Sequence, residues 1–203
     1  MSITSLLNFF FYEMHSSIHS KPRMRRIINS LFILPFTPST IIDYGCGYGE
    51  LIKYIETTSF SYNGFDNDYS SVNIARLRLK NRVNSRVELV NDVSDVSFCS
   101  NVKDSVLIFN GVSHHLEEEC FNSVIQTTNC SAIIILDHDG SKEKLSKIQN
   151  IFQILDKGKY IRPKNYFDNI SNYKCISSEI FYIPSLLAPF WRYFMNVYVK
   201  IDS

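Results

Sequence analysis

Short apolar runs alternate with helix-like stretches along most of this chain of 203 residues. The apolar runs of strand length lie at residues 40–44, 61–65, 86–90, 105–109 and 132–136. Stretches with helical periodicity lie between and after them, at residues 50–57, 70–81, 117–128 and 142–155. Because the strands are apolar on both faces and alternate with helices, the pattern predicts a parallel sheet between two helix layers.

Two further stretches precede the first strand. Residues 3–19 and 23–34 are predicted to be helices, with Pro22 at the start of the second and Pro35 at its end. Proline fits the first turn of a helix and cannot continue one. The basic side chains at the start of the second stretch are Lys21, Arg23, Arg25 and Arg26. We interpret them as a solvated helix face, and a contact of residues 1–26 with substrate phosphates or lipid headgroups at a membrane surface stays open.

The last part of the chain departs from the alternation. Residues 175–183 and 193–201 both read as strands, and the loop at residues 184–189 is too short to hold a crossover helix. The sequence therefore predicts a terminal antiparallel hairpin. Together the elements predict one α/β domain over residues 1–203, with N-terminal helices over residues 1–38 and then a doubly wound, mostly parallel seven-stranded sheet.

Composition and charge narrow the class of protein. A hydrophobic fraction of 45% excludes a disordered chain or a fibre. The five cysteines are odd in number and never spaced as C-x-x-C, which argues against a disulfide framework or zinc site and favours the cytoplasm. A net charge of +1 provides no basic field, so we do not expect a nucleic-acid partner. No apolar run approaches the roughly 18 residues of a membrane span.

The segment IIDYGCGYGEL carries the strongest local signal. A strand ends at Asp43 and runs into Gly45, Gly47 and Gly49. Alternate glycines allow a turn to approach a ligand closely with its backbone, in front of the helix expected next. A dinucleotide-binding fingerprint would require glycine where this chain has Glu50, and the Gly-Lys-Ser/Thr ending of a phosphate loop is absent.

This D-x-G-x-G-x-G pattern resembles the first motif of class I S-adenosylmethionine-dependent methyltransferases. The resemblance continues in order through NGFDND, VELVNDV, SVLIFNGVSHHL and ILDKGKYIRP, over residues 40–200 or so. It implies a Rossmann-like methyltransferase fold with S-adenosyl-L-methionine as the cofactor. The cofactor-binding residues that it implies are Asp43, Gly45, Cys46, Gly47, Gly49, Asp66, Asn67, Asp92, Val93, Asn110 and Gly111.

The resemblance also implies a role for each group of these residues. Asp66 would hold the ribose hydroxyls, because a carboxylate accepts hydrogen bonds from both. Asp92 would lie near the adenine amino group, and Asn110 and Gly111 would line the methionine part. Asp43 is expected to orient the glycine turn. The alternative reading makes Asp66 and Asp92 turn or helix caps and leaves the glycine turn without a ligand.

Three histidines follow strands that end at the same sheet edge. His114, His115 and His138 are candidate general bases, because an imidazole can take up a proton near neutral pH. Each could instead cap or pack against a helix. Asp137 and Asp139 flank His138 and raise the possibility of a divalent cation, as in catechol-methylating relatives, but the fourth strand ends in Asn110 and not in an acid. We therefore expect no metal.

The implied activity is methyl transfer to a small molecule or to a glycan or lipid precursor. Oxygen is the favoured acceptor atom, because the histidines suit a hydroxyl group and no N-P-P-Y-type run is present. Two alternatives stay open. The chain could be a catalytically silent member that binds the cofactor and acts as an interaction module, or an NAD-dependent oxidoreductase on a similar sheet, which Glu50 disfavours.

Overall fold

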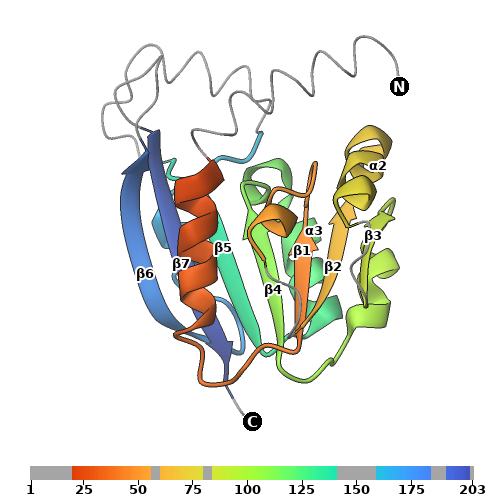
Figure 1. Cartoon of the computed structure of the whole chain (residues 1–203). Helices are drawn as coiled ribbons and strands as arrows, with labels where there is room; N and C mark the ends of the chain where they lie inside the picture. Colours follow the sequence, from red (N-terminus) through yellow and green to blue (C-terminus); the bar gives the residue numbers. More distant parts are fainter. Residues whose placement is uncertain (1–19, 56–59, 80–83, 141–158, 184–190, 202–203) are drawn as a thin grey trace.

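The computed structural model describes residues 20–55, 60–79, 84–140, 159–183 and 191–201 (Figure 1). Within them, seven strands form one sheet in the order β3-β2-β1-β4-β5-β7-β6. The strands are β1 (Thr40–Tyr44), β2 (Ser61–Asp66), β3 (Ser85–Leu89), β4 (Ser105–Asn110), β5 (Ala132–His138), β6 (Tyr173–Ile183) and β7 (Trp191–Lys200). Strands β1 to β5 are parallel, whereas β7 runs antiparallel to both β5 and β6. The predicted mostly parallel sheet and terminal hairpin are confirmed.

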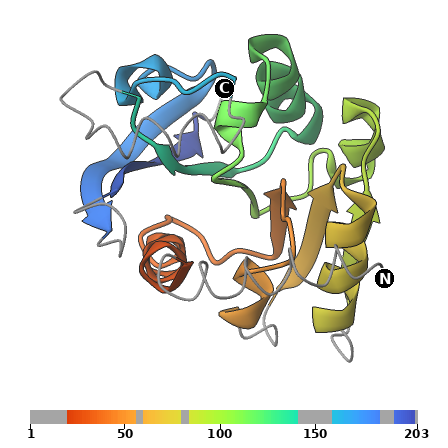
Figure 2. The ribbon, with the colours of Figure 1, turned by 90° about the horizontal axis from the view of Figure 1, so that it is seen from above.

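Helices cover both faces of the sheet (Figure 2). One face packs against the helix of residues 20–31 and against α2 (Tyr69–Arg78), which contribute Met24, Ile27 and Val72 to the core. The other face packs against α3 (Glu118–Thr128) and the short 3-10 helices η2 (Val93–Cys99) and η4 (Lys164–Phe167). The sheet is therefore doubly wound, as the alternation of strands and helices predicts.

The alternating side chains of the central strand join the two halves of the core. In β4, Val106 and Ile108 belong to one hydrophobic cluster, and Leu107 and Phe109 to the other. Because consecutive side chains of a strand point to opposite faces, an entirely apolar strand must be buried on both sides. The parallel pairing of β1 to β5 places their carboxyl ends along one edge, where the glycine turn and the histidines lie.

The helix predicted at residues 50–57 is wrong within the described residues. Only a 3-10 turn, η1 (Leu51–Lys53), follows the glycine turn, with Tyr54 N donating to Leu51 O at 3.0 Å. This tight turn buries Leu51, Ile52 and Ile55 within five residues and returns the chain quickly to the sheet. The helices predicted at residues 3–19 and 142–155 lie outside the described residues.

Candidate functional site

The glycine turn follows β1 and adopts the backbone that its sequence predicts. Gly45, Gly47 and Gly49 have φ angles of 74°, 51° and 75°, a region that side chains rarely adopt. A Cβ atom at Gly45 would lie 2.2 Å from Cγ2 of Val112, whereas a Cβ atom at Gly47 would meet nothing within 4 Å. Gly45 therefore serves close packing, and Gly47 faces open space of the kind that a ligand cradle needs.

Residues at the end of β2 accept hydrogen bonds from the backbone of this turn. The backbone N–H groups of Gly45 and Cys46 donate to the carbonyl of Phe65 at 2.7 and 2.9 Å. Asp66 Oδ2 accepts a hydrogen bond from Gly47 N at 2.7 Å. Partial burial raises the pKa of Asp66, although hydrogen bonds from backbone N–H groups oppose the rise. Asp66 thus lies directly at the glycine turn, as the ribose-binding interpretation requires.

Asp66 Oδ1 accepts from Asp68 N at 2.9 Å across the exposed Asn67. Asp68 in turn caps α2, because its side chain accepts from Ser71 N. A side chain that accepts a backbone N–H at the start of a helix satisfies one of its unpaired donors. The carboxylate of Asp66 accepts one hydrogen bond on each oxygen and keeps further lone pairs for a ligand.

The third acidic position lies in the loop after β3. Asp92 is exposed and precedes η2, which begins at Val93. The backbone N–H of Asp92 donates to Asp95 Oδ2 at 3.0 Å, so Asp95 fixes this loop. Burial raises the pKa of the Tyr44 hydroxyl, and so do the nearby Cys120, Asp66 and Asp92. Asp66 and Asp92 therefore both act electrostatically on Tyr44, a residue beside the glycine turn that the motif comparison did not single out.

Asp43 has a different environment from the one expected. It is 1% exposed and accepts a hydrogen bond from the hydroxyl of Tyr62 at 2.6 Å, while its Oδ1 has no partner among the described residues. Burial raises the pKa of Asp43 to about 7, despite the opposing hydrogen bond from Tyr62. The backbone of the glycine turn is bound by Phe65 and Asp66, whereas the carboxylate of Asp43 binds the hydroxyl of Tyr62.

The fourth strand brings Asn110 and Gly111 to the same edge. Gly111 has a φ of 68°, and its N–H donates to Leu136 O of the next strand at 2.7 Å. Asn110 Oδ1 is buried and has no partner among the described residues. The helix of residues 20–31 reaches this point, because Arg23 Nη1 lies 3.1 Å from where a Cβ atom of Gly111 would be.

His114 and Asp137 form a close pair of ionisable groups at this edge. It is 3% exposed in the 3-10 helix η3 (Ser113–His115), and its Nδ1 lies 2.6 Å from Asp137 Oδ1. Asp137 Oδ2 accepts from the backbone N–H of His114 at 3.1 Å and from the hydroxyl of Ser113. Burial alone would raise the pKa of Asp137, but His114, His138 and Ser113 outweigh it and hold that pKa below its usual range.

The other two histidines lie beside this pair. The ring centroid of His115 is 4.0 Å from that of His114, and the ring centroid of His138 is 5.4 Å away. His115 is exposed, whereas His138 is partly buried and packs against Tyr193 at 4.4 Å. The structure therefore brings all three candidate histidines together, and a ring nitrogen of His114 faces the carboxylate of Asp137.

The segment at residues 159–163 holds the histidine loop in place. Arg162 donates to the carbonyl oxygens of Ser113 and Leu116, both at 2.8 Å. Tyr160 N donates to the carbonyl of His114 at 2.9 Å, and the hydroxyl of Tyr160 donates to a carboxylate of Glu117. These contacts give the K-Y-I-R part of the sequence motif a physical role, since they fix both ends of η3.

The two acids that flank His138, Asp137 and Asp139, both bind other groups of the protein. Asp137 binds His114 and Ser113, and Asp139 pairs with Arg192 at 3.0 Å and accepts from Lys164 N. Among the described residues, no group of three or more histidines, cysteines and acids is placed to hold a metal ion. In the same part of the chain, no helix is long and apolar enough to cross a membrane.

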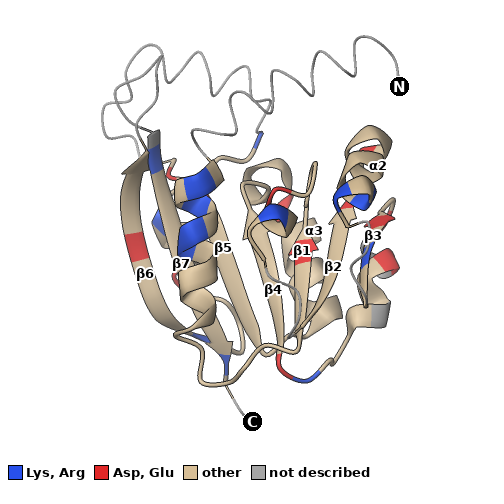
Figure 3. Cartoon of the chain, in the orientation of Figure 1, with Lys and Arg blue, Asp and Glu red and all other residues tan. Residues whose placement is uncertain are grey.

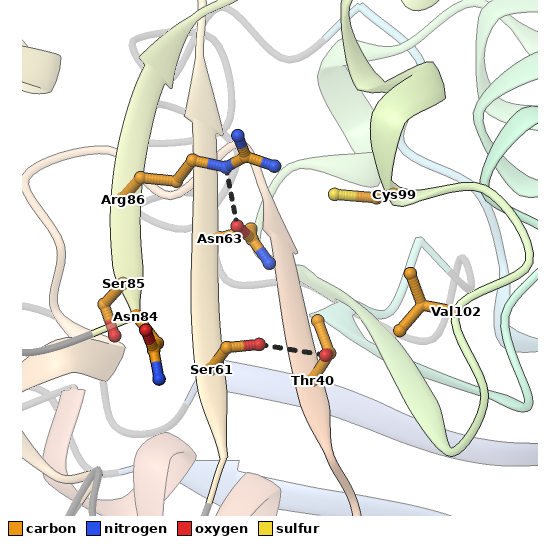
Figure 4. Close-up of a pocket in the computed structure, with 8 residues that line it drawn as sticks. All are labelled: Thr40, Ser61, Asn63, Asn84, Ser85, Arg86, Cys99 and Val102. Carbon is orange, nitrogen blue, oxygen red and sulfur yellow. Dashed lines mark hydrogen bonds between the residues drawn. The ribbon is translucent and has the colours of Figure 1, made fainter.

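A separate polar pocket of about 420 Å³ lies at the opposite edge of the sheet, where β1, β2 and β3 begin (Figure 4). Arg86 Nε donates to Asn63 Oδ1 at 2.8 Å within it, and Thr40 and Ser61 share a hydrogen bond of 2.9 Å. The glycine turn follows the other end of β1, so this pocket is not part of the site described above.

Comparisons with known proteins find methyltransferases with a similar fold. Residues 41–129 match a family model described as a methyltransferase domain. No curated protein matches the chain.

Solved structures match over most of the chain. A SAM-dependent methyltransferase from Anabaena variabilis is 18% identical, with a TM-score of 0.59, 86% of this chain covered and 84% of that one. A SAM-dependent methyltransferase from Methanosarcina mazei is 12% identical, with a TM-score of 0.65 and coverages of 87% and 98%. The plantazolicin methyltransferase BamL, in complex with a triazolic desmethylPZN analogue and SAH, is 15% identical, with a TM-score of 0.64 and coverages of 98% and 91%. At these identities the likeness shows the fold.

Proposed function

We propose that the chain is a class I S-adenosylmethionine-dependent methyltransferase and that it methylates a hydroxyl group of a small molecule or of a glycan or lipid precursor, with His114 as the general base. The observation that carries the proposal is the buried pair of His114 Nδ1 and Asp137 Oδ1, 2.6 Å apart at the carboxyl edge of the sheet. Ligands of open α/β sheets bind at this edge.

The residues at the glycine turn suit the cofactor. Gly47 leaves open space in front of the turn, and Asp66 keeps lone pairs for the ribose hydroxyls. Asn67, Asp92 and Val93 would contact the adenosine part, with Asn110 and Gly111 at the methionine part. The remaining proposed contacts are Asp43, Gly45, Cys46 and Gly49. When bound, S-adenosylmethionine supplies a methyl group activated by its sulfonium.

Asp137 determines which nitrogen of His114 can act as a base. An ionised carboxylate only accepts hydrogen bonds, so the 2.6 Å contact requires a proton on Nδ1. Neutral His114 then carries its lone pair on Nε2, the atom that would take the proton of an acceptor hydroxyl. Asp137 also stabilises the imidazolium that this proton transfer produces. Its lowered pKa keeps it ionised at neutral pH.

His115 and His138 act in this proposal through their position. His138 is one of the groups that lower the pKa of Asp137, and its ring packs against that of Tyr193. The exposed His115 lies beside His114, at a ring distance of 4.0 Å. Together with the contacts of Arg162, these rings keep His114 out of water and fixed in orientation.

The test follows a labelled methyl group onto a panel of phenols, sugars and polyprenyl or glycan precursors. We expect product with the label on oxygen, seen by NMR, and a loss of turnover of roughly 100-fold to 10,000-fold in His114→Gln and Asp137→Asn. Calorimetry should show that both variants still bind S-adenosylhomocysteine. Glu119→Gln, an exposed position on α3, serves as the control.

Other outcomes separate the alternatives. A label on nitrogen, carbon or sulfur, or full turnover in His114→Gln, contradicts hydroxyl methylation with His114 as base. A wild-type protein that binds the cofactor and labels no acceptor in the panel or in cell extract is instead the silent interaction module.

A further inference from the structure

The pocket at the amino ends of β1, β2 and β3 places polar side chains on an inner face of the sheet (Figure 4). Its strand residues include Thr40, Ser61, Asn63 and Arg86. Thr40 is paired with Ser61, and Asn63 with Arg86, so these four side chains share one face. Two residues further along β1 and β2, Ile42 and Phe65 belong to the hydrophobic cluster on that same face. Polar groups at such positions lower the stability of a fold unless they find hydrogen-bond partners.

Asn63 has a donor group that the described residues leave without an acceptor. The residue is 8% exposed, and its Oδ1 accepts from Arg86 Nε at 2.8 Å. Because an arginine only donates, this contact directs the amide oxygen toward Arg86 and the amide nitrogen into the pocket (Figure 4). No hydrogen bond from that nitrogen exists within the described residues. Two N–H donors of a buried side chain therefore face the pocket.

Arg86 makes the pocket electropositive. Its guanidinium extends over β2 toward Cys99 on the opposite wall (Figure 4). Burial raises the pKa of Cys99 to about 11, and the charge of Arg86 opposes that rise, so its field reaches across the pocket. Acidic side chains lie on β3 and on the helix after it (Figure 3), but none is among the eight described residues that line the pocket. The acid of β3, Glu88, pairs with Arg76 at 3.3 Å. This arrangement favours an anion.

The remaining lining suits a ligand that carries hydroxyl groups. Thr40 and Ser61 share a hydrogen bond of 2.9 Å, and Ser85 Oγ accepts from Tyr62 N at 3.4 Å. A hydroxyl group has one proton and two lone pairs, so these side chains can exchange further hydrogen bonds with ligand hydroxyls. The volume of about 420 Å³ lies in the range of small-molecule sites and exceeds what an inorganic anion of five heavy atoms fills.

We propose that this pocket binds the phosphate ester of a small polyhydroxylated molecule, with the phosphate on Arg86 and Asn63 and the hydroxyl groups on the serine and threonine side chains. A phosphate group offers three terminal oxygens in different directions, whereas a carboxylate offers two in one plane. The donors of Arg86 and Asn63 come from two strands and suit the former. The pocket shares no residue with the glycine turn or the histidines, so its ligand is neither the proposed cofactor nor the methyl acceptor.

The test measures binding to the full chain by calorimetry. Glycerol 3-phosphate, ribose 5-phosphate and glucose 6-phosphate are compared with inorganic phosphate, free ribose and gluconate. We expect at least one of the three esters to bind about tenfold or more tighter than each comparison compound. Saturating S-adenosylhomocysteine should leave that affinity within about twofold, because the glycine turn follows the other end of β1.

Variants assign the two parts of the ligand. Arg86→Gln should weaken the ester by about tenfold or more, and Arg86→Lys, which keeps the charge, by less. Ser85→Ala should weaken the ester by about threefold or more and leave inorganic phosphate within about twofold. Arg76→Gln, which removes an arginine outside the pocket, is the matched control and should bind like the wild type. Thermal unfolding shows whether each variant is folded.

Several results overturn the inference and leave the proposed methyltransferase untouched, since the two sites have no residue in common. Inorganic phosphate that binds as tightly as the esters makes the pocket a bare anion site, and tighter gluconate replaces phosphate with carboxylate. Unchanged affinity in Arg86→Gln, or competition with S-adenosylhomocysteine, places the ester elsewhere. If Arg86→Gln does not fold, unchanged affinity in Ser85→Ala contradicts the site. Absence of binding by all three esters contradicts it outright.

Discussion

Burial in the interior of this protein raises the pKa of one acid, Asp43. Its carboxyl group is 1% exposed, and among the described residues only the Tyr62 hydroxyl donates to it. Burial disfavours the charged form and raises the pKa to about 7, while Asp66 adds a smaller electrostatic contribution in the same direction. In the unfolded chain the same group releases its proton near pH 4. Between these values, the folded state holds a proton that the unfolded state has lost.

We predict that Asp43 makes the ligand-free protein less stable as the pH rises from about 4 to 7, by on the order of 1 kcal/mol per pH unit. The stabilisation is complete below the unfolded pKa and is lost as the pH passes the folded pKa. Asp43→Asn should remove this slope and exceed the wild type in free energy of unfolding by about 2–4 kcal/mol above pH 7. Urea unfolding of both proteins at pH 5 and pH 8 measures the effect. A difference between the two proteins that does not change with pH would contradict it.

Within the glycine turn, Gly45 is packed against Val112, whereas Gly47 faces open space. We predict that Gly47→Ala folds with a loss of only about 1–2 kcal/mol, since its φ of 51° is strained for alanine and no atom meets the added Cβ. Its affinity for S-adenosylhomocysteine should fall by about tenfold or more, because the methyl group enters the open space before the turn. Urea unfolding and calorimetry measure the two effects.

Gly45→Ala provides the contrast within the same turn. Its Cβ atom would lie 2.2 Å from Val112, so the turn and the loop after β4 must move apart, and we expect a larger loss of stability than for Gly47→Ala. Wild-type affinity in Gly47→Ala would show that the ligand does not approach this turn.

The elements also show what the sequence could and could not predict. The strands were predictable to within one or two residues at most ends, because consecutive β-branched and apolar residues fit a sheet buried on both faces. The turn at Leu51–Lys53 was not, since a 3-10 turn and a helix start share the same apolar spacing. The partnership of Asp137 with His114, 23 residues apart, depends on the pairing of β4 with β5, which local periodicity does not specify.

For the whole molecule, the candidate site exists because parallel strands bring distant segments to one edge. Asp66 meets Gly47 there, Asp137 meets His114, and Arg23 meets Gly111. The order of the motifs indicated the contact of Asp66 with Gly47, because both residues lie in motifs that resemble those of the family. Arg23 lies before the matched domain, and nothing in its spacing distinguishes it from the exposed Lys21 and Arg25 on the same helix.

A ligand that contacts so many segments should stabilise the entire fold, because it binds the folded state and not the unfolded chain. At a concentration 100 times its Kd, S-adenosylhomocysteine should add about 2.7 kcal/mol, which for a protein of this size raises Tm by roughly 5–10 °C. NAD at the same concentration should leave Tm unchanged, since Glu50, buried and paired with Lys53 and Arg78, stands where a dinucleotide-binding turn has glycine. Differential scanning calorimetry with each ligand measures both shifts. A shift with NAD would mean that the edge formed by these segments binds a dinucleotide, and no shift with S-adenosylhomocysteine would mean that it does not bind the proposed cofactor.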